Sequence, residues 1–208
     1  WAVRWLLLIG LPATLGLIVL AEPLMYTLFQ YDQFTPEDAR MAARSLMAYG
    51  IGLMGFLGVK ILVPGFSARE DLMTPARFGV YAVIVNLALS LLLALLFAPE
   101  GWAHAGLALA ASLASLVNAG LLLGTLYRHQ VYRPEPGFRS FFLRVLLANA
   151  SMGGLLLLAA GSAAWTGWAA HARVLQLTLW ITLGIGAYAM TLALAGLRPR
   201  HLLLPHGA

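Results

Sequence analysis

Long uninterrupted runs of apolar residues dominate the pattern of this 208-residue chain. Each run has about the 20 residues that an α-helix needs to cross a lipid bilayer. None shows apolar-polar alternation, and each is longer than the roughly 10 residues of a membrane β-strand. The pattern predicts an all-α polytopic membrane helix bundle with six transmembrane helices, at about residues 5–21, 45–63, 78–98, 105–127, 145–165 and 174–197.

Polar residues beside the apolar runs predict where some helices begin and turn. Thr35-Pro36-Glu37-Asp38 offers an N-cap, a proline at the first helical position and two acids at the positive end of the helix dipole. We therefore expect the second helix to begin in water and to enter the membrane near Ser45. Pro99-Glu100-Gly101-Trp102 predicts a tight turn with an interfacial tryptophan, which joins the third and fourth spans as a helical hairpin.

Two spans carry residues that predict how they meet their neighbours. The first contains Pro12, which frees a backbone carbonyl and is tolerated in lipid where a neighbouring helix can satisfy that carbonyl. We expect a kink near it. The fourth carries Ser112, Ser115 and Asn118 at intervals of three, and small polar residues of this kind suit a helix–helix contact with interhelical hydrogen bonds.

The composition agrees with a membrane protein and excludes a hidden soluble domain. Hydrophobic residues make up 61% of the chain and charged residues 10%, which leaves too few polar groups to cover a core in water. The net charge of +5 does not predict nucleic-acid binding, because the basic residues lie in loops and form no stripe with interleaved aromatics. Because the chain opens at Trp1, almost directly on a span, we expect it to be a fragment of a longer protein.

The distribution of arginines predicts an orientation. Arginines that flank membrane spans are more frequent on the cytoplasmic side. One side of the predicted bundle carries nine and the other three, so we expect the nine-arginine side, and with it both ends of the chain, to be cytoplasmic. The nine are Arg4, Arg69, Arg77, Arg128, Arg133, Arg139, Arg144, Arg198 and Arg200; the three are Arg40, Arg44 and Arg173.

No catalytic or cofactor chemistry is indicated by the residues. Gly50-Ile-Gly-Leu-Met-Gly55 matches a dinucleotide-binding pattern, but that motif must follow a strand at a water-facing crevice, and this one lies inside an apolar span. The histidines are scattered at span ends without ligand spacing, and there is no cysteine. We therefore predict no enzyme activity, no catalytic residue, no metal site and no cofactor.

Lys60 is the residue with the strongest functional signal, because it lies inside the second predicted span. It either faces a water-filled cavity or snorkels to headgroups roughly 10 Å away along the helix. At 100° per residue, Tyr49 shares its side of the helix, and we expect Gly52, Gly55 and Gly58 to form a smooth packing face opposite.

Charged residues after this span form a short loop. Arg69 and Asp71 are either a helix cap or a loop salt bridge, which is the simpler interpretation, or contacts to a substrate.

The stretch from Lys60 to Pro75 resembles the signature of the MurJ (MviN) family of lipid II flippases, within the multidrug/oligosaccharidyl-lipid/polysaccharide exporter superfamily. Lys60, Pro64, Phe66, Ala68-Arg69, Asp71 and Thr74-Pro75 match it, whereas Ser67 and Glu70 stand where the family often has Tyr and Gln. Residues 28–39 and 106–119 also look like the family's corresponding stretches. The resemblance covers essentially the whole chain and maps to the last six of the family's fourteen helices.

The resemblance implies part of an inner-membrane flippase that moves an undecaprenyl-pyrophosphate-linked peptidoglycan precursor by alternating access between two bundles. Its implied partners are lipid II, membrane lipids and the N-terminal bundle of the same protein. The family's last two helices form a lateral groove suited to a lipid tail, which corresponds here to 145–165 and 174–197. The candidate substrate-binding residues are Lys60, Tyr49, Arg69, Asp71 and Asn118.

Two alternatives remain open at this point. One is a related polysaccharide-lipid exporter, against which the signature between Lys60 and Pro75 argues. The other is a helix bundle that scaffolds cell-wall assembly and transports nothing. Lys60 and the polar residues of the fourth span favour a lined cavity over a scaffold.

Overall fold

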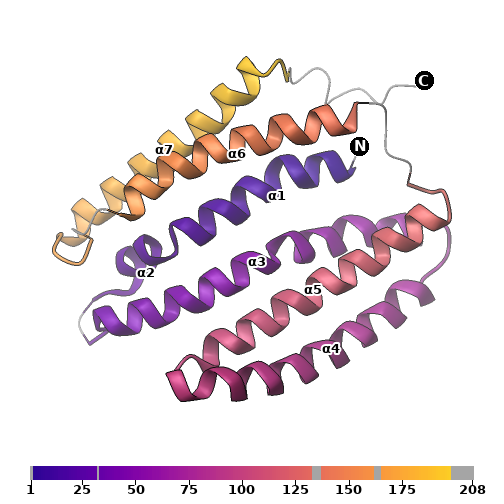
Figure 1. The fold of residues 1–208 in the computed structure, drawn as a ribbon, viewed down its shortest axis with the longest axis horizontal. Helices are drawn as coiled ribbons and strands as arrows, with labels where there is room; N and C mark the ends of the chain where they lie inside the picture. Colours follow the sequence, from indigo (N-terminus) through magenta and orange to yellow (C-terminus); the bar gives the residue numbers. More distant parts are fainter. Residues whose placement is uncertain (1, 32, 133–136, 162–164, 198–208) are drawn as a thin grey trace. The chain divides into compact units, whose positions relative to one another are not determined.

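All regular structure in the computed structural model is helical, over the residues that it describes: 2–31, 33–132, 137–161 and 165–197. These ranges contain seven α-helices and one short 3-10 helix, and the α-helices are labelled in Figure 1. In chain order they are α1 (Ala2–Val19), α2 (Ala21–Phe29), α3 (Pro36–Ser67), α4 (Met73–Phe97), η1 (Ala98–Glu100), α5 (Ala103–Arg128), α6 (Phe138–Ala160) and α7 (Ala170–Leu194).

Six of the described helices are long and apolar enough to cross a membrane, which confirms the predicted fold class. Several begin before the predicted span, most clearly α6 at Phe138 and α3 at Pro36. Hydropathy detects only the section of a helix that is buried in lipid, whereas backbone hydrogen bonding continues the helix into the headgroup layer. The predicted cap is present, since the Thr35 hydroxyl accepts the Asp38 backbone N–H at 3.2 Å. The predicted turn is present too, with η1 followed by Gly101 at φ 73°.

The chain divides into two compact units, and helix α3 starts in one and continues in the other. Unit 1 comprises Trp1–Ala43 and Glu135–Ala208. In it, α6 lies against both α7 and α1, and α2 lies against α7 (Figure 1). Its core is a cluster of large apolar side chains, with Leu20, Met152 and Leu156 almost fully buried.

Buried Arg173 of α7 forms hydrogen bonds that link the short helix α2 to α7 within unit 1. Its Nε donates to the Trp168 carbonyl at 2.8 Å, and one terminal nitrogen donates to the carbonyls of Tyr26 at 2.9 Å and Gln30 at 3.3 Å. The last carbonyls of a helix have no partner inside the helix, so a buried cation is a suitable donor for them. The sequence pattern had identified Arg173 only as one of three loop charges.

Unit 2 comprises Arg44–Pro134. Helices α4 and α5 form the predicted hairpin, and they approach closely where Gly106 faces the backbone of Leu93. A smaller apolar cluster, formed by Leu62, Phe66, Leu122 and Leu126, joins α3 to α5. The outer side of α4 is lined by large apolar residues that are more than half exposed, such as Leu87 and Leu91, as expected of a surface that lipid covers.

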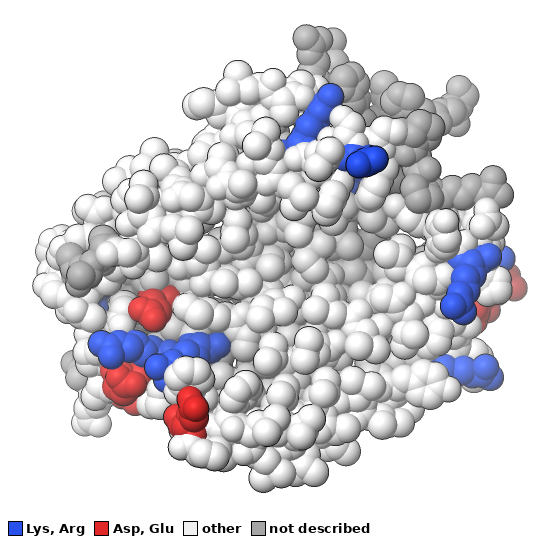
Figure 2. Space-filling view, in the orientation of Figure 1, with Lys and Arg blue, Asp and Glu red and all other residues white. Residues whose placement is uncertain are grey.

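Charged side chains lie near the ends of the helices. On the face shown in Figure 2, blue and red residues gather there, and uncharged side chains cover the middle sections. This distribution fits a lipid-buried middle flanked by headgroups. Of the arginines counted for orientation, Arg133, Arg198 and Arg200 lie outside the described residues, so the orientation stays a prediction.

Candidate functional site

A hollow with a mostly apolar lining and a few polar side chains lies among α3, α4 and α5 within unit 2. Its volume is about 400 Å³. Lys60 lies on its α3 wall, Asn86 on its α4 wall, and Ser115 and Asn118 on its α5 wall. The remaining lining residues are small or apolar: Phe56, Val59, Gly79, Ala82, Val83, Ala111 and Ala114. The hollow therefore combines room, one cation and several hydrogen-bonding groups at membrane depth.

Small residues on α3 and α5 make this arrangement possible, because they bring the two backbones together. A Cβ atom on Gly55 would lie 2.6 Å from the backbone nitrogen of Leu116, and one on Gly52 would lie 2.5 Å from Cα of Ser112. The Ser112 hydroxyl donates to the Ala48 carbonyl at 2.6 Å, and the Ser115 hydroxyl donates to the Gly52 carbonyl at 3.1 Å. These contacts confirm the predicted helix–helix contact for Ser112 and Ser115, whereas no interhelical hydrogen bond of Asn118 is seen among the described residues.

Lys60 lies on the exposed side of α3, away from this packing face. Gly52, Gly55 and Gly58 are all buried, whereas Lys60 is exposed and borders the hollow. The backbone at this point is unusual as well, because Pro64 lies inside α3 and has no N–H to donate to the Lys60 carbonyl. Lys60 therefore offers two polar groups at membrane depth, its side-chain ammonium and its backbone carbonyl.

Two asparagine side chains share the hollow with Lys60. Asn86 accepts a hydrogen bond from the Ser90 hydroxyl at 3.4 Å. The side-chain oxygen of Asn118 is buried and has no hydrogen-bond partner among the described residues. A polar atom in that state is costly unless water or a ligand completes it. Asn86 is not among the site residues predicted from the sequence, although an asparagine inside a 25-residue apolar helix is a usable signal.

The structure divides the five predicted site residues among three places. Lys60 and Asn118 line the hollow among α3, α4 and α5. Arg69 and Asp71 line a smaller pocket of about 130 Å³ with His129, in the loop after α3 and at the end of α5. Tyr49 is 48% exposed on α3 and lines neither cavity.

Asp71 performs the capping role that the simpler interpretation gave it. One carboxylate oxygen accepts the backbone N–H of Thr74, in the first turn of α4, at 3.0 Å. That backbone hydrogen bond, assisted by the Thr74 side chain, lowers the pKa of the Asp71 carboxyl, because it favours the charged form.

An apolar groove of about 490 Å³ lies in unit 1, among α1, α2, α6 and α7. Its walls include Pro12 and Gly16 of α1, Met152 and Leu156 of α6, and Gly184 of α7. The groove has the apolar lining that a hydrocarbon chain requires.

One polar contact crosses this groove between α1 and α7. Pro12 cannot donate to the Leu8 carbonyl, and the Tyr188 hydroxyl donates to it instead at 2.7 Å. This confirms that a neighbouring helix satisfies the carbonyl freed by Pro12. Helix α1 runs as one helix through Pro12, and the kink expected there stays a prediction.

Six long apolar helices among the described residues define the class: this is a multi-pass α-helical membrane protein. The family model described as "Lipid II flippase MurJ" matches residues 1–182. The chain therefore belongs to the MurJ family.

Relatives from three bacteria agree with this family assignment. "Probable lipid II flippase MurJ" of Vibrio cholerae is 37% identical over 203 residues, which are 97% of this chain and 38% of that protein. The Haemophilus influenzae protein of the same name is 36% identical, over 98% of this chain and 39% of that protein. "Lipid II flippase MurJ" of Burkholderia cenocepacia is 35% identical, over 80% of this chain and 31% of that protein. The chain thus spans less than half the length of these relatives.

Proposed function

We propose that this chain is the C-terminal part of a lipid II flippase of the bacterial inner membrane. The complete protein would move the undecaprenyl-pyrophosphate-linked peptidoglycan precursor across that membrane by alternating access, without catalysing a reaction. The observation that carries this proposal is the match of the MurJ family model to residues 1–182, together with relatives that are named for this activity.

Lys60 is the residue that we assign to the substrate's pyrophosphate. An ammonium is a compact charge that pairs well with phosphate oxygens. The side-chain amides of Asn86 and Asn118, on the facing walls of the same hollow, can donate further hydrogen bonds. A lysine against lipid at mid-bilayer would cost about 2.5–3.5 kcal/mol on insertion scales. Water in the hollow would remove much of that cost, and the exposed position of Lys60 on its wall supports the cavity interpretation over snorkelling.

The apolar groove of unit 1 is the place that we assign to the lipid tail. The resemblance implied a groove along the last two helices, and α6 and α7 do line this one. Helices α1 and α2 contribute the remaining walls, which the resemblance did not imply. The orientation with both ends in the cytoplasm belongs to the same proposal and rests on the nine-to-three division of arginines.

The test of Lys60 uses the purified full-length protein reconstituted in vesicles. Lys60→Met should lose transport of lipid II in reconstituted vesicles, and Lys60→Arg should keep a large part of it. Tyr49→Phe is the matched control on the same helix, because Tyr49 lies outside the hollow. Normal transport by Lys60→Met would show that this lysine only snorkels.

Thiol labelling tests the hollow separately, in full-length protein from which any cysteine outside this chain has been removed, since residues 1–208 contain none. A water-soluble thiol reagent should modify Lys60→Cys and leave Gly58→Cys unmodified, because position 58 is buried. The opposite pattern would contradict the hydrated hollow. Full-length protein that binds lipid II but moves none would instead favour the scaffold alternative.

A further inference from the structure

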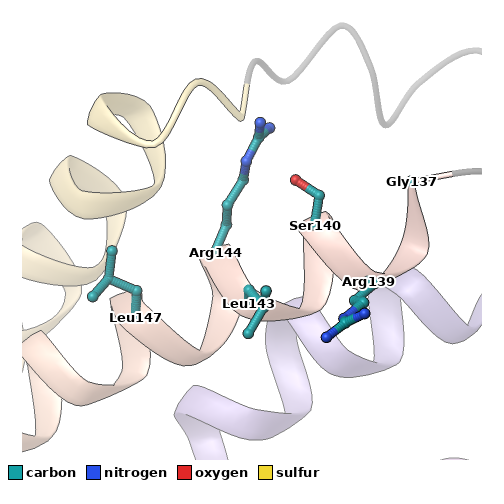
Figure 3. A pocket seen from close by; sticks show the side chains of 6 residues that line it. All are labelled: Gly137, Arg139, Ser140, Leu143, Arg144 and Leu147. Atoms are coloured by element: carbon teal, nitrogen blue, oxygen red, sulfur yellow. The ribbon is translucent and has the colours of Figure 1, made fainter.

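Helix α2 lies at one end of the apolar groove of unit 1. Residues from α1, α2, α6 and α7 surround this groove. The hollow at the beginning of α6 is different, because its described lining comes from one helix, and Figure 3 shows Arg139 and Arg144 projecting to opposite sides of that helix. That hollow offers a single open face, whereas the groove can enclose a hydrocarbon chain.

One stripe of helix α7 is open along part of its length and covered along the rest. At 100° per residue, Arg173, Leu177, Ile181, Gly184 and Tyr188 lie within about 80° of one another. The last three line the groove. Leu177 is only 7% exposed, within the core cluster of unit 1, and Arg173 is 8% exposed. The groove therefore stops between Ile181 and Leu177, on the part of the unit where α2 lies against α7.

The groove has a defined length between its two ends. At one end the Leu8 carbonyl of α1 accepts the Tyr188 hydroxyl at 2.7 Å, and at the other end Leu20 and Leu24 form the wall at α2. Leu8 and Leu20 are separated by about 18 Å, at 1.5 Å per residue of helix. The hydrocarbon layer is about 30 Å thick. The groove can therefore hold only a segment of a long tail.

The position of α2 depends on Arg173. A helix of nine residues is too short to be stable without tertiary contacts. Arg173 donates to the carbonyls of Tyr26 at 2.9 Å and Gln30 at 3.3 Å, at the end of α2. Arg40 donates to the Tyr26 hydroxyl at 3.2 Å, but its side chain is 49% exposed. Loss of a buried charged donor costs more than loss of an exposed one, so Arg173 provides the stronger contact.

We propose that Arg173 is a positioning residue for the lipid tail of the substrate. By holding α2 across the end of the groove, it makes Leu24 the furthest point that the tail reaches, and any further length of tail turns out into the bilayer. Arg173 acts through α2 and does not line the groove itself. This inference rests on the proposed function, because it requires the tail to lie in this groove.

The experiment maps how far a tail reaches in the full-length protein reconstituted in vesicles. Polyprenyl diphosphates of increasing tail length carry a photoreactive diazirine at the free end of the tail, and mass spectrometry identifies the residues that become cross-linked. In the wild type, cross-links should follow the groove and stop at Leu24 and Ile181. In Arg173→Gln they should advance by at least one helical turn, about 5.4 Å, to Leu177. Arg173→Lys keeps a charged donor and should restore part of the wild-type limit.

Further variants separate the end wall from the general stability of the fold. Leu24→Trp leaves Arg173 unchanged and should move the limit of cross-linking back along α1. The matched control is Arg44→Gln, which removes an arginine of unit 2 that lies over the Trp102 ring at 4.2 Å, and it should leave the limit unchanged. Leu143 is 57% exposed outside the groove, so its labelling by lipid should be equal in every variant.

The outcomes distinguish this inference from the proposed function. A wild type without any cross-links in the groove would contradict the assignment of the tail itself. Groove cross-links that stop at the same residues in the wild type and in Arg173→Gln would overturn only the role of Arg173. Loss of all groove cross-links in Arg173→Gln, without recovery in Arg173→Lys, would show that this residue only maintains the fold and would also overturn its role. An unchanged limit in Leu24→Trp would exclude α2 as the end wall, even if Arg173→Gln did not fold.

Discussion

The helices of the two units are held together by different means. In unit 2, small residues bring α3 and α5 so close that serine hydroxyls of one helix reach backbone carbonyls of the other. In unit 1, large apolar side chains separate α1, α6 and α7, and a groove of about 490 Å³ remains along them. The polar contact that links α1 to α7 there goes to the carbonyl that Pro12 leaves without a helical donor.

The difference shows how a membrane protein can pack two helices closely in one region and leave a groove between helices in another. Lipid tails are as apolar as leucine, so burying leucine gives little drive to close a gap between membrane helices. Close packing and hydrogen bonds supply that drive, and both occur at the α3–α5 contact. In unit 1, hydrogen bonds join Ser151 of α6 to Thr191 of α7 and Tyr188 of α7 to Leu8 of α1, and the groove lies beside them. Unit 1 can therefore keep an apolar groove that hydrocarbon can fill. In unit 2, the close contact between α3 and α5 fixes the walls of the hollow beside it.

The largest effect is expected from adding bulk at the close contact. Gly55→Ala would place a methyl group 2.6 Å from the Leu116 backbone nitrogen, so α3 and α5 must separate. We expect a loss of at least about 1–3 kcal/mol in the free energy of unfolding, measured by denaturant titration in micelles. Gly120→Ala on α5 is the control, because no atom lies within 4 Å of its added Cβ. Equal stability of the two variants would contradict the close contact.

The next largest effect is expected at the carbonyl freed by Pro12. Tyr188→Phe removes the hydroxyl that donates to the Leu8 carbonyl, and that carbonyl then has no helical donor. We expect a loss of about 1–2 kcal/mol, within the range of polar contacts inside membrane proteins. Pro12→Ala should restore the helical N–H, so the double variant Pro12→Ala/Tyr188→Phe should recover most of the loss. A double-mutant cycle that shows no recovery would mean that Tyr188 stabilises unit 1 by packing alone.

A smaller effect is expected from the hydroxyls of unit 2. Ser112→Ala removes the hydrogen bond to the Ala48 carbonyl, and Ser115→Ala removes a hydroxyl whose proton is shared between the Gly52 carbonyl at 3.1 Å and the Ser112 carbonyl of its own helix at 2.8 Å. The Ala48 and Gly52 carbonyls keep their helical N–H donors inside α3. We expect a loss of about 0.6 kcal/mol for each variant. Losses larger than that of Tyr188→Phe would show that polar contacts, and not close backbone packing, dominate the α3–α5 contact.

The smallest effect is expected at a polar contact in water, at the edge of unit 2. The Thr74 backbone N–H holds the pKa of Asp71 below its ordinary value, so the charged form stabilises the fold. That contribution is complete above the ordinary pKa of about 3.9 and is lost as pH falls through the lower, folded-state pKa. The melting temperature of the wild type should therefore exceed that of Asp71→Asn at pH 6, and the gap should shrink as the pH falls below the ordinary pKa and through the lowered pKa of Asp71. A constant gap across this range would exclude the carboxylate charge as its source.

Most of the fold could be predicted from the sequence because lipid imposes one simple requirement. Every backbone group in the membrane must be bonded internally, so a long apolar run becomes a helix. The cap at Thr35, the turn at Gly101 and the hairpin of α4 and α5 followed from local residue chemistry in the same way. The end of α1 at Val19 and the early start of α6 at Phe138 could not, since hydropathy does not mark where hydrogen bonding begins or ends.

The candidate site was predictable only in part. The sequence by itself determined that Lys60 lies at membrane depth, that glycines form the packing face of its helix, and that the fourth span meets a neighbour through serines. Only the tertiary structure decided that Asn86 and Asn118 share a hollow with Lys60, that Arg69 and Asp71 lie elsewhere, and that Arg173 is buried against α2. The reason is that local spacing fixes which face of a helix a residue occupies, whereas the residues that meet it depend on how separate helices pack.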